Sequence, residues 1–396
     1  MSARTPRHAS EQRRPRRLAR GAGLAALSVA LFAGSSFGLA YNDFQTNIER
    51  HDINEYLGER PTADGEEPAP IDASAGEDIN IVILGSDTRE GEGNEEFAAP
   101  EGGGQRSDTT MLAHISADRT RVEIVSIPRD SLVTVPSCMM ADGTWTEPRY
   151  DAMFNSAFSL GAGGGDIGTA AACTMRTIEE LTGILLDDFV IVDFAGFINV
   201  VNALGGVPMC IPERIDDPLA GLQLEPGQQV LDGRTALGFA RARYNVGDDG
   251  SDISRIGRQQ ELVAAIAREA LSKNLLTDLP QLYRFLDSAT QTLTTGSQLG
   301  SIPTLAGLAY SLRGIDLESI VFETMPFDWA GPRVRPSAEA EELWAALRAD
   351  QPIEGALTAT GEEPTEEPTD GGTDVPATEE PPVTTEPAPT PTSICP

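Results

Sequence analysis

The chain has 396 residues, a length that as a soft prior corresponds to two or three domains and is sufficient for a full hydrophobic core. It carries 61 acidic and 29 basic residues, so its formal charge is −32. A general affinity for nucleic acid needs an excess of Lys and Arg, and this class of partner is therefore excluded. The three histidines are scattered, and only His114 lies in the expected folded region. This argues against a Ser-His-Asp or Cys-His enzyme and against a His-rich metal site.

The N-terminus combines a basic segment with one apolar stretch. Residues 1–20 contain seven arginines and a single acid, and residues 21–41 are uncharged and mostly apolar. Because a helix of this length, at about 1.5 Å per residue, matches the hydrocarbon core of a bilayer, the pattern predicts a single-pass transmembrane anchor. The arginines place residues 1–20 in the cytoplasm and everything after the anchor outside the cell. A cleaved signal peptide is the alternative, since Gly38-Leu39-Ala40 offers small residues for cleavage.

Export changes how the cysteines are interpreted. Four cysteines in an oxidising compartment are compatible with two disulfides, which can be paired in three ways. We favour a bond between Cys138 and Cys173, which would close a loop of about 35 residues and stabilise the fold by about 3 to 4 kcal/mol. A free, buried Cys173 is the alternative. The pairing of Cys210 and Cys395 stays open.

Composition divides the rest of the chain. Residues 42–75 become acidic and Pro-rich and are expected to form a stalk, whereas residues 356–396 are rich in Pro, Thr and Glu, contain no base and are expected to be disordered. Residues 76–355 are expected to form one catalytic domain. In this part β-branched runs alternate with helical patterns, which predicts an α/β layered fold with a central mixed sheet flanked by helices. The expected strands are 79–84, 110–116, 122–127, 189–193 and 320–323, and the expected helices are 169–181, 194–204 and 255–273.

Charged residues stand at the ends of three of these expected strands. In chain order they are Asp87, Arg89, Arg106, Asp108, Arg129 and Asp130. In layered α/β folds ligands bind at strand ends, where loops can aim side chains into one crevice. Asp87 and Asp108 supply the hard oxygen ligands that Mg²⁺ prefers.

Two further cationic motifs lie in the C-terminal half. Arg241 and Arg243 alternate, so an extended segment would place both guanidinium groups on one side. Arg255, Arg258 and Gln259 lie at the start of a helix, where cations oppose the helix dipole unless an anion lies between them. Guanidinium groups suit phosphate because their planar fork donates two parallel hydrogen bonds. Each motif alone is more often a cap or a solvated face, but together they predict a phosphoryl-transfer site for a di- or pyrophosphate.

These motifs resemble those of the LytR-CpsA-Psr family of cell-wall ligases. The resemblance covers residues 78–275 and rests on NIVILGSDTR, RSDTTMLAHISADRTRVEIVSIPRDSLV, FNSAFSLG, LTGILLDDFVIVDFAGFINVVNALGGV and LDGRTALGFARARYNVGDDGSDISRIGRQQ. Proteins of that family are membrane proteins, mostly of Gram-positive bacteria, that move a glycopolymer from a polyprenyl pyrophosphate carrier onto peptidoglycan. The strong preference for Arg over Lys fits an actinobacterial member. The identity of the glycopolymer and the prenyl chain length stay open.

The resemblance also implies roles for individual residues. The expected catalytic residues are Asp87, Asp108, Arg129, Arg241 and Arg243. The expected substrate-binding residues are Arg89, Arg106, Asp130, Asn155, Arg255, Arg258 and Gln259. Asp87 and Asp108 would hold Mg²⁺ or Mn²⁺, and the prenyl chain would thread into an apolar core between sheet and helices. The alternative function is a wall-associated protein that binds anionic or prenyl-phosphate ligands without chemistry.

Overall fold

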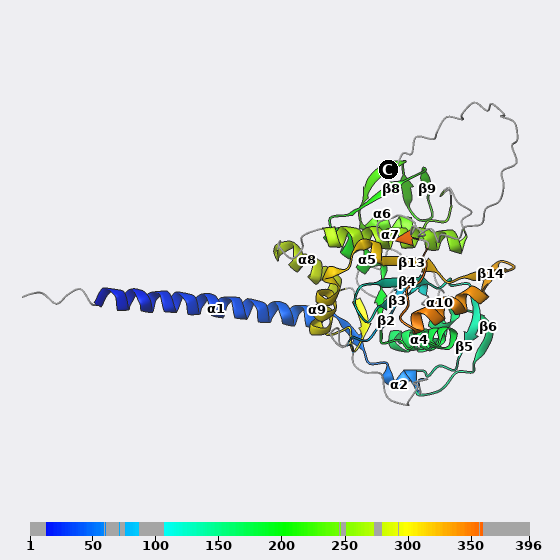
Figure 1. Ribbon diagram of the computed structural model, residues 1–396, viewed down its shortest axis with the longest axis horizontal. Helices are drawn as coiled ribbons and strands as arrows, with labels where there is room; N and C mark the ends of the chain where they lie inside the picture. Colours follow the sequence, from blue (N-terminus) through cyan, green and yellow to red (C-terminus); the bar gives the residue numbers. More distant parts are fainter. Residues whose placement is uncertain are drawn as a thin grey trace, which may run out of the picture.

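A mixed sheet of eight strands forms the centre of the protein and lies between two helical layers (Figure 1). The computed structural model describes residues 13–58, 60, 71, 76–86, 107–244, 246, 251–272, 279–291, 293–355 and 357–358. In order across the sheet the strands are β1 (Glu49–His51), β12 (Leu293–Gly296), β7 (Asp188–Val192), β2 (Ile79–Ser86), β3 (Ser107–Ile115), β4 (Val122–Ser126), β13 (Ile320–Thr324) and β16 (Leu357–Thr358). The strand β3 runs antiparallel to both of its neighbours, β2 and β4, whereas β7 runs parallel to β2 and β13 parallel to β4. The predicted α/β fold with a central mixed sheet is therefore confirmed.

Helices and short ribbons surround this sheet. The helices are α1 (Arg13–Asn47), α2 (Asn54–Leu57), α3 (Ser156–Gly161), α4 (Ile167–Thr182), α5 (Phe194–Ala203), α6 (Gly233–Arg241), α7 (Asp252–Ser272), α8 (Leu279–Thr290), α9 (Ile302–Ser311) and α10 (Ala338–Arg348). The antiparallel ribbons pair β5 (Leu132–Val135) with β6 (Arg149–Met153), β8 (Val207–Ile211) with β11 (Gly227–Leu231), β9 (Ile215–Asp217) with β10 (Leu222–Leu224), and β14 (Phe327–Ala330) with β15 (Arg333–Pro336). The helices α4 and α10 cover one face of the sheet, and α5 and α7 cover the other (Figure 1).

Standard start and stop signals define the ends of the predicted helices. Asp166 precedes α4, and its carboxylate accepts a hydrogen bond from the amide of Thr169 at 2.8 Å. Gly183 ends α4 with φ 66°, the left-handed conformation that glycine adopts without strain. Asp193 caps α5 through the amide of Gly196 in the same way. Such caps stabilise helices by about 1 kcal/mol each, which explains why these helices begin close to the predicted residues.

The α4 face of the sheet carries the larger core. Strand alternation directs Val82 and Leu84 of β2 into this core, and both are fully buried. Trp344 of α10 and Met175 of α4 pack in the same cluster. This side of the sheet is closed by tightly packed apolar side chains and leaves the opposite face as the place for a site.

The segment before residue 76 is more structured than predicted. The helix α1 continues without interruption to Asn47 and projects from the domain as a rod (Figure 1). It includes the whole of the predicted anchor, residues 21–41. Among the described residues, however, no helix is both long and apolar enough to cross a membrane. The following residues, which we expected in a free stalk, join the domain: β1 pairs with β12, and Leu57 of α2 is buried in the large core.

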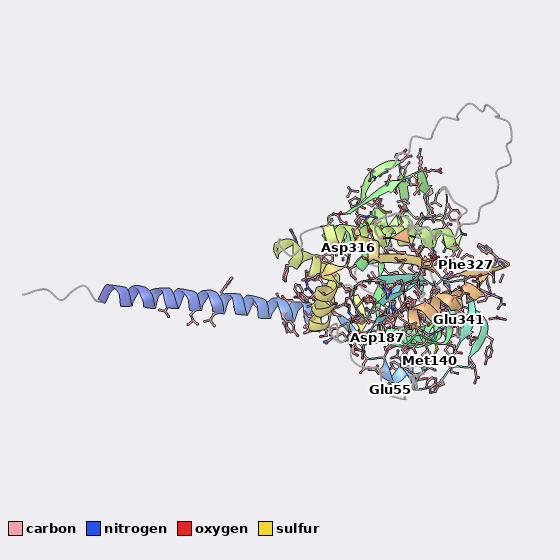
Figure 2. The ribbon with its side chains drawn as sticks, viewed as in Figure 1. Glu55, Met140, Asp187, Asp316, Phe327 and Glu341 are labelled. Carbon is pink, nitrogen blue, oxygen red and sulfur yellow. A yellow bond between two sulfur atoms is a disulfide. The ribbon has the colours of Figure 1, made fainter. Side chains whose placement is uncertain are left out.

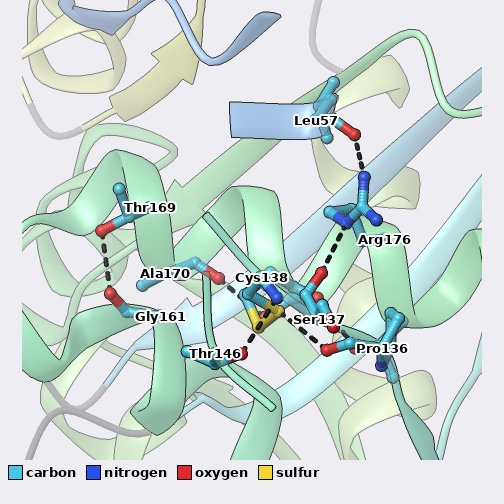
Figure 3. The surroundings of a disulfide bond; sticks show 12 residues. Leu57, Pro136, Ser137, Cys138, Thr146, Gly161, Thr169, Ala170 and Arg176 are labelled. Atoms are coloured by element: carbon cyan, nitrogen blue, oxygen red, sulfur yellow. Dashed lines mark hydrogen bonds between the residues drawn. A yellow bond between two sulfur atoms is a disulfide. The ribbon is translucent and has the colours of Figure 1, made fainter. Parts of the chain in front are cut away.

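A disulfide joins Cys138, which follows β5, to Cys173 within α4, as predicted. Both cysteines are fully buried. One turn further along α4, Arg176 donates a hydrogen bond at 3.1 Å to the carbonyl oxygen of the residue before Cys138 (Figure 3). The disulfide therefore attaches the loop between β5 and β6 to α4. Cys210 is disulfide-bonded as well, and Cys395 lies outside the described residues.

A buried polar network lies where β3 ends and β4 begins. Glu123 of β4 is only 2% exposed and is the register partner of His114 on β3. Its nearest cation is Arg121, with Nη1 3.5 Å from Oε1. Burial raises the pKa of Glu123 to about 7; Arg121 lowers it, and Asp350 and Asp118 raise it. This carboxyl therefore holds its proton more tightly in the folded than in the unfolded chain.

We expect Glu123→Gln to remove a pH dependence of stability. The folded pKa of about 7 lies above the ordinary value of 4.5. The carboxyl therefore contributes stability below pH 4.5, and that stability is lost as the pH rises to about 7. Glutamine does not titrate, so the variant should gain roughly 3 kcal/mol relative to the wild type over this window. Urea unfolding at a series of pH values measures this gain, and a difference that does not change with pH would contradict it.

Candidate active site

The antiparallel register brings the charged strand ends together at one end of the sheet. Ser86, the last residue of β2, pairs with Ser107 at the start of β3 after a register shift at Gly85. Asp108 is therefore the second residue of β3. Because β4 runs antiparallel to β3, the chain that leaves β4 towards Arg129 emerges beside Asp108. Irregular registers of this kind often aim side chains into functional sites.

Arg129 is surrounded by three carboxylates. Its Nη1 donates a hydrogen bond to Oδ1 of Asp108 at 3.0 Å. Its Nε lies 3.0 Å from Oδ1 of Asp252 and 3.6 Å from Oδ1 of Asp130. Burial lowers the pKa of Arg129, but the three carboxylates outweigh this and raise it. Arg129 is therefore a permanently charged, part-buried cation held in place from several sides.

Asp252 joins Arg129 to the start of α7. Its Oδ1 is ion-paired with Arg255, three residues further along the helix, as well as with Arg129. Arg255 is 3% exposed, and its Nη2 also donates to the carbonyl oxygen of Asp108 at 3.2 Å. Burial raises the pKa of the Asp252 carboxyl, while Arg255 and Arg129 lower it. One carboxylate oxygen thus fixes two guanidinium groups side by side.

Sequence reasoning missed Asp252. The cations at the start of α7 predicted an anion between them, and in the structure Asp252 supplies a negative charge at that position. The signal was an acid in the first helical turn, three residues before Arg255, a spacing at which side chains on a helix face each other. A carboxylate is also the preferred charge at a helix N-terminus.

The two arginines of the alternating motif separate in the structure. The prediction of an extended segment is wrong for Arg241, because α6 continues to that residue. Its guanidinium lies 4.7 Å from the ring centre of Phe194 on α5. Arg243 follows the helix, and its charge lowers the pKa of both Asp252 and Arg255. Arg243 therefore belongs to the cluster around Asp252, whereas the cation–π contact of Arg241 is with α5.

Other predicted residues support this cluster through the backbone. Arg258 donates to the carbonyl oxygen of Ala242 at 2.5 Å, and Gln259 to that of Ala240 at 3.2 Å. Both side chains are buried, so they fix the segment that carries the alternating arginines. The amide of Asn155, directly before α3, donates to the carbonyl oxygen of Arg129 at 3.0 Å. The predicted site residues Asp87, Arg89 and Arg106 lie outside the described residues.

The cluster contains polar atoms that have no hydrogen-bond partner in the described part of the chain. They are Nε of Arg129, Nε of Arg255 and Oδ2 of Asp252, and all three are buried. Buried polar atoms in proteins are nearly always paired. Nε of Arg255 is thus a buried donor without a hydrogen bond, and Nε of Arg129 has only its ion-pair contact with Oδ1 of Asp252 at 3.0 Å. Two adjacent guanidinium groups of this kind suit an oxyanion with several acceptor oxygens.

Of the two aspartates predicted to bind a metal, the structure describes only Asp108. Its side chain is 41% exposed, and Oδ1 contacts Arg129. Within the described residues, no group of three or more His, Cys, Asp or Glu side chains is placed to hold a metal ion. This donor set fits an ion that takes one or two carboxylates from the protein and its other ligands from phosphate and water, as Mg²⁺ does.

The face of the sheet towards α5 and α7 has a looser apolar surface than the α4 face. On β7, Phe189 and Ile191 are buried against the large core, whereas Val190 and Val192 are only half-buried. Val190 packs at the margin of a cluster to which Leu305 of α9 also belongs. On β2, Ile83 is likewise half-buried and packs at the margin of a smaller cluster with Val263 of α7. The sheet therefore presents apolar side chains that the helices do not fully cover, starting at the strands that lead to the cluster.

Comparison with known proteins identifies a family model and several relatives that are similar to this chain. The model of the LytR_cpsA_psr family matches residues 41–345. "Probable cell wall biosynthesis protein LcpB" of Corynebacterium glutamicum is 33% identical over 280 residues, 68% of this chain and 61% of that protein. The match thus spans less than two thirds of LcpB. "Polyisoprenyl-teichoic acid--peptidoglycan teichoic acid transferase TagU" of Oceanobacillus iheyensis is 27% identical over 61% of this chain and 67% of that protein.

A solved structure shares the fold. It is described as a LytR-Csp2A-Psr enzyme from Actinomyces oris, and it superposes with a TM-score of 0.51 at 21% identity, over 76% of this chain and 95% of that chain. This likeness supports the mixed sheet and its helical layers. Because the family model covers most of the chain, from the end of α1 to α10, the protein belongs to the LytR_cpsA_psr family.

Proposed function

We propose that this protein is a phosphotransferase that moves a glycopolymer from a polyprenyl pyrophosphate carrier onto peptidoglycan. The observation that carries the proposal is the pair of guanidinium groups of Arg129 and Arg255, which Asp252 holds side by side, with a buried N–H donor on Arg255 that makes no hydrogen bond in the described part of the chain. Such a pair recognises the oxygens of a pyrophosphate. The name of TagU, a polyisoprenyl-teichoic acid–peptidoglycan transferase, supports the same reaction class.

The proposed reaction is attack by a sugar hydroxyl of peptidoglycan on the phosphorus that bears the glycopolymer. A new phosphorus–oxygen bond forms, the bond to the bridging oxygen breaks, and prenyl phosphate leaves with that oxygen. Arg129, Arg243 and Arg255 would neutralise charge on the transferring group, which is the main contribution of a protein to phosphoryl transfer. When Mg²⁺ or Mn²⁺ is bound by Asp108, with Asp87, it would add further neutralisation of phosphate charge.

The half-buried apolar surface of the sheet that faces α7 and α9 would receive the prenyl chain. Val190, Val192 and Ile83 belong to strands that end at or beside the arginine cluster, so a lipid lying on them would place its phosphate at Arg129. Covering these side chains stabilises the complex in proportion to the apolar area that leaves water. Lipid and pyrophosphate would thus be bound by neighbouring parts of one continuous surface.

The proposed location follows from the N-terminal sequence. Residues 21–41 are uncharged, follow seven arginines, and lie within the single helix α1. We propose that this segment anchors the protein in the cell membrane, with the N-terminus in the cytoplasm and the catalytic domain outside. The lipid carrier and peptidoglycan would then be on the same side of the membrane as the domain.

The purified full-length protein should release prenyl phosphate from a polyprenyl-pyrophosphate sugar in the presence of Mg²⁺ and a peptidoglycan acceptor. Mass spectrometry measures this release together with the phosphodiester-linked product. A protein that binds the substrate tightly but forms no product would favour the alternative of a wall-associated binder. If the protein neither bound nor turned over any of several polyprenyl pyrophosphates, both proposed functions would be contradicted.

Removal of divalent metal should abolish transfer without unfolding the domain. Asp108, the expected ligand that the structure describes, lies part-exposed at one end of the sheet, and the core on the α4 face does not depend on it. Chelation by EDTA should therefore stop product formation, and added Mg²⁺ or Mn²⁺ should restore it. Circular dichroism spectra before and after chelation should coincide. Full activity in EDTA would remove the metal from the proposal.

A further inference from the structure

The helices α8 and α9 form the face of the domain from which α1 projects (Figure 1). The last turn of α1 is attached to α8. The ring of Phe44 lies 5.1 Å from the ring of Tyr283. Three residues later, Nδ2 of Asn47 donates to Oδ1 of Asp287 at 3.1 Å. The end of α1 is therefore fixed on α8 by an aromatic contact and a polar contact one turn apart.

The same turn of α1 is attached to the start of α9. Nε2 of Gln45 donates to the carbonyl oxygen of Gly300 at 2.8 Å, and its Oε1 accepts from the amide of Ile302 at 3.2 Å. Since both ends of this amide group are used, the orientation of α1 relative to α9 is defined. The end of α1 is therefore held on the domain by direct contacts with both α8 and the start of α9.

This attachment lies directly at the end of the uncharged segment. Phe44 follows Tyr41, the last residue of that segment, by three residues, which in a helix is a rise of about 5 Å. The headgroup layer on each side of a bilayer is roughly 5 to 8 Å thick. If residues 21–41 span the bilayer, the helices fastened to Phe44 and Gln45 lie at the level of the headgroups.

The side chains on this face suit such a position. Tyr283 and Leu286 of α8 are 42% and 36% exposed, and Tyr310 of α9 is 67% exposed. The helix α9 contains no charged residue; Leu305 and Leu308 pack at the margin of a small core cluster, and none of its residues is fully buried. The guanidinium of Arg313 lies 3.6 Å from the ring centre of Tyr310. Exposed tyrosines next to arginines are typical of protein surfaces at the membrane interface.

The charge of this face also differs from that of the whole chain. The helices α8 and α9 and the following turn, Leu312–Gly314, contain two arginines, Arg284 and Arg313, and one acid, Asp287, so their net charge is +1. The whole chain has a formal charge of −32. The next acids along the chain are Asp278, directly before α8, and Asp316, after the turn. A weakly cationic, aromatic surface on a strongly acidic protein matches an anionic lipid surface.

We propose that α8 and α9 rest on the outer surface of the membrane, with Tyr283 and Tyr310 among the lipid headgroups and Arg284 and Arg313 on anionic lipids. The proposal depends on the membrane anchor proposed above. It adds that the catalytic domain lies on the bilayer in one fixed orientation, with α8 and α9 facing the lipids. The ribbon of β14 and β15 then points away from the membrane.

Nitroxide labels can test this arrangement in the full-length protein. We would place single labels at Leu27→Cys in α1, Tyr310→Cys in α9 and Trp329→Cys in β14, and insert each variant into phosphatidylglycerol nanodiscs with one copy per disc. Trp329 is a matched control because it is 63% exposed and packs on Phe327, which lies on the far side of the domain from α1 (Figure 2). Power saturation with oxygen and a nickel chelate reports contact with lipid and with water.

The expected result is high oxygen contact at position 27, several-fold less nickel contact at 310 than at 329, and unrestricted nickel contact at 329. Lipid contact at 27 with equal nickel contact at 310 and 329 would overturn the docking proposal and leave the anchor intact. Water contact at 27 would overturn both. Protection at 310 that also occurs in concentrated protein without lipid would indicate a second copy of the chain on this face and would overturn the proposal.

Charge reversal gives an independent measurement. Arg284→Glu combined with Arg313→Glu should raise the nickel contact of a label at Leu286→Cys several-fold in phosphatidylglycerol discs. The matched control reverses Arg214 and Arg335, two exposed arginines that are ion-paired elsewhere, and should have no effect. Equal nickel contact in both double variants would contradict the role of the arginines. Prenyl phosphate release from detergent-solubilised substrate, which needs no bilayer, tests the proposed reaction separately.

Discussion

Arg129→Ala is expected to lower the rate of glycopolymer transfer by about 10²- to 10³-fold, the range found when one preorganised donor to transition-state charge is removed. Arg129 is the cation that contacts Asp108 and Asp252 at once, so its loss removes a phosphate donor and the link between β3 and α7. Product formation under single-turnover conditions measures the effect. The melting temperature should be recorded in parallel, because the buried Asp252 loses one of its two cations.

Two further variants make this result specific. Arg129→Lys keeps the charge but loses the planar fork, so its activity should lie between those of the wild type and the alanine variant. Arg214→Ala removes an arginine that is paired with Asp216 at 3.3 Å on the exposed β9 ribbon and should leave transfer unchanged. If Arg129→Ala transferred glycopolymer at the wild-type rate, the proposal that Arg129 binds the pyrophosphate would be contradicted.

Replacing Cys138 and Cys173 together by alanine should lower the free energy of unfolding by about 4 kcal/mol in the chain-entropy model. The two cysteines are separated by 35 residues, and the bond limits the conformations of that segment in the unfolded chain. Equilibrium unfolding in denaturant measures the loss. The single variant Cys138→Ala should lose a similar amount, since either change breaks the bond. A loss below about 1 kcal/mol would show that the disulfide adds little to stability.

The sequence predicts those parts of the fold that have strong local patterns. The β-branched runs of β2 and β4 and the caps of α4 and α5 define elements close to their observed limits. The three-residue strand β1, with the polar sequence ERH, carries no such pattern. It forms because Glu49 and its neighbours pair with β12, more than 240 residues away in the chain. Pairing of this kind depends on tertiary contacts that local periodicity does not report.

The candidate site shows a similar division. Arg129, Asp108 and Arg255 come together as the motifs predict, because strand ends and a helix start converge at one edge of the sheet. The partners of Arg258 and Gln259 were not predictable, since only the folded structure shows that they bond to carbonyl groups of the arginine segment. Composition and spacing indicate which charges are present, whereas their partners are decided by packing.

The helix α7 connects the two ends of the domain. It is 21 residues long, which corresponds to roughly 30 Å. It begins with Asp252 at the arginine cluster, and six residues separate its end from α8. With α8 on the membrane, the reacting phosphate would be held about one helix length above the bilayer. A carrier lipid would have to be drawn out of its leaflet by that distance before reaction. A prenyl chain shorter than α7 could not keep one end among the lipids while its phosphate reacts. The length of α7 would therefore set a minimum length for the prenyl chain of the carrier.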